Sequence, residues 1–147
     1  MFGEFLKRLT AERPAPIDGT DVKLALGALL VRIARSDGDY SAIEAEHITR
    51  ILASHFDLSA AEADAMRTDA EVLEAEAPDT VRFTRAIKDA VSHEDREEVV
   101  EALWELVLAD GNRDHEEDGI LRLVAPLLGI NDRDSALARQ RVVARMG

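Results

Sequence analysis

The chain has 147 residues, of which 46% are hydrophobic and 33% are charged, and its formal net charge is -12. Its length fits one ordinary domain with a hydrophobic core, and its composition argues against disordered and fibrous classes. The excess of acidic residues disfavours nucleic acid and anionic membrane surfaces as partners, and the absence of cysteine excludes disulfides and thiolate metal sites.

Residues 1–19 are predicted to form a short helix and a linker ahead of the main domain. The stretch from Phe2 to Leu9 is amphipathic, and the two prolines within residues 13–16 are typical of a linker. No apolar run here is long enough for a secretion signal or a membrane-spanning helix. We therefore expect an intracellular, cytoplasmic protein without a transmembrane segment.

Helical patterns dominate the rest of the chain. In residues 21–36 the apolar side chains recur at the spacing of one helical face. Ser41, Ser59 and Asp114 each precede a glutamate by three residues, which is typical of a capping box at a helix start. No segment alternates apolar and polar residues as a half-buried strand would. The sequence predicts one compact all-α domain over residues 20–147, with about seven to eight helices in the whole chain.

This domain is predicted to contain an internal repeat, over about residues 28–59 and 101–131. In each copy a helix ends at Asp-Gly, a polar loop and a glutamate follow, and apolar residues come four and seven positions after the glutamate. The matching pairs are Asp37 and Asp110, Gly38 and Gly111, Glu44 and Glu116, Ile48 and Ile120, and Ile51 and Leu123. Each half is therefore expected to be a helix–loop–helix hairpin.

Negative charge is concentrated in two blocks, and each block contains one Asp-Gly sequence. Residues 37–76 hold eleven acidic and two basic side chains, and residues 89–118 hold twelve acidic and two basic ones. The remaining segments are mildly basic. If the two hairpins pack as a pseudo-symmetric pair, the two loops would lie together and form one acidic surface.

The first Asp-Gly segment (residues 37–44) and the second (residues 110–117) carry oxygen ligands of the kind that Ca²⁺ or Mg²⁺ prefers. Neither is an EF-hand, because the sixth and twelfth positions lack the required glycine and glutamate. The same side chains can instead end one helix and cap the next, and Arg113 could replace a cation in the second segment. The sequence leaves both interpretations open. The predicted metal ligands are Asp37, Asp39, Glu44, Asp110, Asp114 and Glu116.

The sequence contains little that indicates catalysis. Glu44 and His47 have the spacing of half a di-iron motif, but a second half is missing. Nucleophile signatures and glycine-rich phosphate loops are also missing, and Trp104 is expected in the core. We predict a non-catalytic protein, with a hydrolase that uses a carboxylate-bound metal as the remaining enzymatic alternative.

The doubled pattern resembles the tellurite resistance protein B (TerB) family, from about Asp21 to Asn131. The resemblance rests on the Arg-Ser-Asp-Gly and Leu-Ala-Asp-Gly sequences that end at Gly38 and Gly111, together with the glutamates and apolar residues after them. It implies the compact helical fold of a short, stand-alone bacterial TerB-like protein, built from two similar halves. It also implies that Asp37, Glu44, Asp110 and Glu116 lie on an acidic surface that is suspected in the family to bind divalent metal.

The resemblance further implies a stress-response system linked to tellurite, with partner proteins near the membrane and no established catalytic activity. We therefore expect a non-catalytic acidic module that binds a divalent cation (Ca²⁺, Mg²⁺ or Zn²⁺), a partner protein, or both. Contact with the inner face of the membrane would be peripheral and through partners. The first alternative is a metal-independent scaffold whose acidic face binds a basic partner, and the second is the metal-dependent hydrolase.

Overall fold

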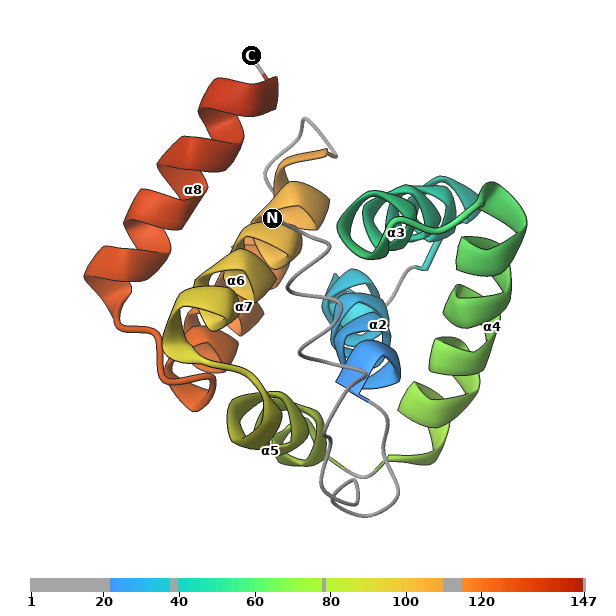
Figure 1. The fold of residues 1–147 in the computed structure, drawn as a ribbon, viewed down its shortest axis with the longest axis horizontal. Coiled ribbons are helices and arrows are strands. Elements are labelled where there is room, and N and C mark those ends of the chain that lie inside the picture. The colour runs from blue at the N-terminus through green and yellow to red at the C-terminus, as the bar shows by residue number, and fades with distance from the viewer. Residues whose placement is uncertain (1–21, 38–39, 78, 110–114, 147) are drawn as a thin grey trace.

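The computed structural model describes residues 22–37, 40–77, 79–109 and 115–146, and for Asp37, residues 115–118 and Ile120 it describes the backbone alone. Within these ranges the chain forms seven α-helices and one 3-10 helix, with no strand (Figure 1). The helices are α2 (Val22–Ala34), η2 (Arg35–Asp37), α3 (Ala42–Phe56), α4 (Ala60–Glu76), α5 (Val81–Ala90), α6 (His93–Ala109), α7 (His115–Leu127) and α8 (Asp132–Met146). The all-α prediction is confirmed, while the predicted helix and linker in residues 1–19 lie outside the described residues.

Local capping explains where two of these helices begin. At the start of α3, the Ser41 hydroxyl accepts from the Glu44 backbone N–H, and the Ser41 N–H donates to the Glu44 carboxylate, both at 3.1 Å. Ser59 and Glu62 form the same reciprocal pair at the start of α4. Both predicted capping boxes are present, and each satisfies two backbone N–H groups that lack a partner within the helix. The third, at Asp114, lies outside the described residues.

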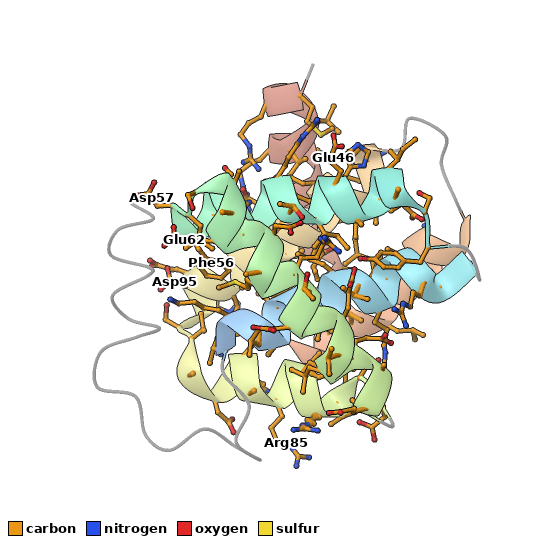
Figure 2. All side chains as sticks on the ribbon, turned by 90° about the vertical axis from the view of Figure 1, so that its right-hand side faces the viewer. Glu46, Phe56, Asp57, Glu62, Arg85 and Asp95 are labelled. Atoms are coloured by element: carbon orange, nitrogen blue, oxygen red, sulfur yellow. The ribbon has the colours of Figure 1, made fainter. Side chains whose placement is uncertain are left out.

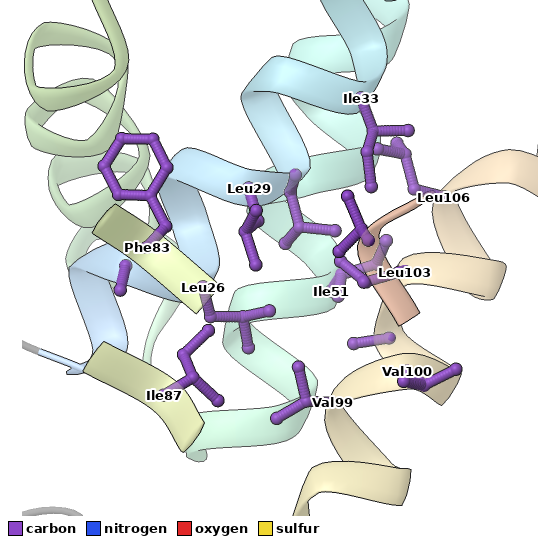
Figure 3. Packing of buried hydrophobic residues seen from close by; sticks show 14 of the residues in the cluster. Leu26, Leu29, Ile33, Ile51, Phe83, Ile87, Val99, Val100, Leu103 and Leu106 are labelled. Carbon is purple, nitrogen blue, oxygen red and sulfur yellow. The ribbon is translucent and has the colours of Figure 1, made fainter. Parts of the chain in front are cut away.

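The helix α2 forms the centre of the molecule. Ten of its 13 residues are buried, because α3, α4, α5, α6 and α7 all contact it. The predicted helix is confirmed, and its burial extends beyond the predicted apolar face to Gly27, Ala28, Val31 and Ala34. Figure 3 shows Leu26, Leu29 and Ile33 of α2 among apolar side chains from α3, α5 and α6.

The helices α6 and α8 form a second packed pair. Trp104 of α6 is buried, as predicted, and its indole N–H donates to the Ser135 hydroxyl of α8 at 3.1 Å. At the outer side of this pair, Arg145 contacts Glu101 at 2.6 Å and Glu105 at 2.9 Å. Apolar burial and these polar contacts together fix α8 against α6.

The two predicted hairpins correspond to α2–α3 and α6–α7. The 3-10 helix η2, which leads into the first Asp-Gly segment, contacts α7, and α6, which leads into the second, contacts α3. The helix before the first Asp-Gly segment therefore lies against the helix after the second, and the helix before the second lies against the helix after the first. The limits of the sequence repeat stay a prediction.

Candidate functional site

The predicted cation site falls largely outside the described residues. Asp37 ends η2, and Glu116 lies in the first turn of α7, but their side chains are not among the described ones. Asp39, Asp110 and Asp114 lie outside the described residues altogether. Glu44 is the sixth predicted ligand and has a described side chain. The spatial relation of the six ligands therefore stays a prediction.

Glu44 has a structural role as the acidic member of the first capping box. Its Oε1 atom accepts the Ser41 N–H, which confirms that this glutamate caps α3. An ionised carboxylate offers about four lone-pair sites on two oxygens, so one accepted hydrogen bond does not exhaust it. The capping and cation interpretations are therefore compatible at Glu44.

Arg35, which precedes Asp37, and Tyr40, which follows Asp39, are both attached to α4. The Tyr40 hydroxyl donates to the Glu71 carboxylate at 2.5 Å. The Arg35 guanidinium lies 5.1 Å from the centroid of the Tyr40 ring and 3.1 Å from the Glu74 carboxylate. The described residues before and after residues 38–39 are thus fixed to one helix. The contacts join Arg35 and Tyr40 to Glu74 and Glu71, which are far from them in the sequence. No local sequence pattern predicted these contacts.

Arg67 completes this network on α4. Its guanidinium contacts Glu71 at 2.5 Å and Asp64 at 2.7 Å, and it donates to the Thr49 hydroxyl of α3 at 2.8 Å. Burial raises the pKa of the Tyr40 hydroxyl, and the hydrogen bond to the Glu71 carboxylate raises it further. Tyr40 is therefore a neutral hydrogen-bond donor at physiological pH.

A surface cavity of about 370 Å³ lies between α3, α6 and α8. Its lining includes His47 and Arg50 of α3, Arg145 of α8, and Ala109, the residue directly before the second Asp-Gly segment. The hydrolase alternative requires such a cavity beside the carboxylates. Among the described residues that line it, Glu105 is the one carboxylate, and it contacts His55 at 2.8 Å and Arg145 at 2.9 Å. No described pair of carboxylates faces this cavity to activate a water molecule.

A cluster of one histidine and two carboxylates lies where the N-terminal ends of α6 and α8 meet, and the sequence did not predict it. It consists of His93, Glu97 and Asp134. The spacing of His93 and Glu97 along one helix could have indicated the first contact. Asp134 comes close through the packing of α8 on α6, which no sequence pattern in this chain specifies.

None of the described helices is long and apolar enough to cross a membrane.

Comparison with known proteins identifies one family. A family model described as tellurite resistance protein TerB matches residues 23–140, which is most of the chain. No curated protein gave a significant match. No solved structure gave a significant match either.

Proposed function

The chain belongs to the TerB family, and we propose that it is a non-catalytic acidic module that binds a divalent cation at its paired Asp-Gly segments. The family name links this role to resistance against tellurite. The cation would be Ca²⁺, Mg²⁺ or Zn²⁺, with Asp37, Glu44, Asp110 and Glu116 as principal ligands and Asp39 and Asp114 as further ones. In the cell the module would be cytoplasmic and would act with a partner protein near the membrane.

The reciprocal packing of the two hairpins is the observation that carries this proposal. The 3-10 helix η2 contacts α7, and α6 contacts α3. The helices that precede and follow the two Asp-Gly segments are therefore packed against one another. Ala109, at the end of α6, lines one cavity together with His47 and Arg50 of α3. Such packing supports one shared site, in which carboxylates from both halves surround one ion.

The attachment of the first segment to α4 also supports a binding role. Arg35 and Tyr40 lie before and after residues 37–39 and are held by Glu74 and Glu71, so the chain has a fixed position at both residues. A ligand set that is preorganised loses less conformational freedom when the ion binds. Crowded carboxylates repel one another without an ion, and a cation relieves this repulsion.

A scaffold that needs no metal is the second candidate, and the outer face of α4 favours it. Glu62, Asp64, Asp69 and Glu76 are exposed there, while Arg67 is the one basic residue of this helix. Figure 2 looks onto α4, with Glu62 and Asp57 at one edge and Arg85 of α5 projecting at another. This separation of charge suits a basic protein partner, and binding would then weaken as salt is added.

The proposal is tested by calorimetric titration of chelator-stripped protein with Ca²⁺, Mg²⁺ and Zn²⁺. For at least one cation we expect saturable binding that is lost in both Asp37→Asn and Asp110→Asn, with unchanged helical circular dichroism. Asp69→Asn is the matched control, because it removes one exposed acidic charge from α4 and should bind as the wild type does. Equal binding by all four proteins would contradict a site in the Asp-Gly segments.

The scaffold candidate is separated by its response to salt and chelator. Capture of a basic partner that weakens with added NaCl and is unaffected by EDTA would favour it. Capture that requires the cation and is abolished by EDTA would favour the cation-binding module.

A further inference from the structure

We propose that His93, Glu97 and Asp134 form a separate metal site, which takes a borderline divalent ion such as Zn²⁺ at the contact between α6 and α8. The site shares no ligand with the Asp-Gly segments, so this proposal can be tested independently of the function proposed above. It would connect the N-terminal ends of two helices that otherwise meet through apolar packing, ion pairs and the Trp104–Ser135 hydrogen bond.

The three ligand atoms are spaced for coordination. One nitrogen of His93 and one carboxylate oxygen each of Glu97 and Asp134 all lie within 4.8 Å of one another. The His93 Nε2 atom is 3.4 Å from Glu97 Oε2 and 3.9 Å from Asp134 Oδ2. Ligands about 2.1 Å from a tetrahedral zinc ion are about 3.4 Å apart, so the first distance already fits, and a small rotation of Asp134 would bring the second to it.

These distances are longer than those of hydrogen bonds. An N–H···O bond spans about 2.7–3.2 Å between heavy atoms. His55 shows the alternative, since its Nε2 atom lies 2.8 Å from Glu105 Oε1 in a direct hydrogen bond. The Nε2 atom of His93 instead lies at ion-pair distance from two carboxylate oxygens, and a bound ion would replace these two contacts.

The ligand types select the class of metal. Imidazole nitrogen suits zinc and other transition ions, whereas calcium and magnesium prefer oxygen alone. Three protein ligands leave a coordination position for water. The side chains of His93, Glu97 and Asp134 are 51%, 30% and 28% exposed, so an ion can reach them from solvent.

The surroundings leave the two carboxylates available. Arg141 approaches Glu97 only to 4.0 Å, because its guanidinium is held by Glu101 at 2.7 Å. The backbone N–H of Asp134 donates to the Asn131 side chain at 2.8 Å, which fixes Asp134 in the first turn of α8.

The test is a Zn²⁺ titration of the full chain, followed through the imidazole resonances of its four histidines by long-range proton–nitrogen NMR. We expect the His93 ring signals to shift and saturate, and the melting temperature to rise on binding. In protein that carries Asp110→Asn, which removes the site proposed at the Asp-Gly segments, His93→Gln should abolish the rise in melting temperature, and Asp134→Asn should weaken binding by about tenfold or more. Glu94→Gln and Asp132→Asn are the matched controls, because each removes one exposed charge from the first turn of α6 or α8.

Asp37→Asn and Asp110→Asn should leave the zinc response of His93 intact, which separates this site from the Asp-Gly segments. The proposal is overturned if the His93 ring signals stay unchanged up to millimolar Zn²⁺. It is equally overturned if His93→Gln in the Asp110→Asn protein retains the full rise in melting temperature, because the ion would then be bound elsewhere.

Discussion

At the scale of single residues, Gly27 determines how closely α2 approaches α4. A Cβ atom at this position would lie 2.8 Å from the Cβ of Ala70, which is fully buried. We expect Gly27→Ala to lower the free energy of unfolding by about 1–3 kcal/mol, because the two helices must separate to make room. Gly119→Ala is the control, since open space surrounds that position in α7, and it should raise stability by up to about 1 kcal/mol. Urea unfolding curves measure both, and equal stability of the two variants would contradict this account.

Tyr40 gives a second prediction at this scale. Burial and the hydrogen bond to Glu71 raise its pKa in the folded protein, so the fold favours the neutral hydroxyl. This contribution is fully present below the ordinary tyrosine pKa of about 10 and is lost as the pH rises toward the folded value. Tyr40→Phe should cost about 1 kcal/mol near neutral pH and should reduce the loss of stability above about pH 10. Thermal unfolding across this pH range measures it, and identical pH profiles would contradict the assignment.

At the scale of helices, one buried hydrogen bond links α6 to α8. The indole N–H of Trp104 donates to Ser135, so Ser135→Ala leaves a buried donor without its acceptor. We expect a loss of about 1–3 kcal/mol in the free energy of unfolding. Trp104 is the single tryptophan of the chain, so its fluorescence follows unfolding at this contact directly. Ser54→Ala changes an exposed serine of α3 and should be neutral, and an equal loss in both variants would argue against the hydrogen bond.

The same scale explains what could be predicted from the sequence. The capping boxes at Ser41 and Ser59 depend on residues three positions apart, so local chemistry was sufficient to find them. The burial of α2 on nearly every side depends on five surrounding helices, and one-sided spacing in α2 does not contain that information. Like the capping boxes, the ligands predicted in the Asp-Gly segments were inferred from the local spacing of residues.

Contacts between distant helices could not be predicted. Tyr40 contacts Glu71, and His93 contacts Asp134, only because apolar packing brings together the parts of the chain that carry them. Their polar side chains carry no periodic pattern that would identify the partner. The sequence therefore predicted the helices and the chemistry of one candidate site, while the second site required the structure.

At the scale of the whole molecule, the net charge of -12 makes the stability of the fold depend on the concentration and type of dissolved ions. Repulsion among the acidic blocks opposes the compact state, and salt screens it. We expect NaCl to raise the melting temperature modestly, and MgCl₂ or CaCl₂ at the same ionic strength to raise it further, because a bound ion stabilises the folded state. The extra rise should disappear in Asp110→Asn. Identical curves for monovalent and divalent salts would mean that screening alone acts.

The shared cation site is tested most directly by amide NMR of chelator-stripped protein during titration with Ca²⁺, Mg²⁺ and Zn²⁺. One ion held by both halves predicts that signals from residues 37–46 and 110–118 shift together and saturate at the same concentration. A flat response of both segments up to millimolar metal would contradict the cation-binding function and leave these residues as helix caps.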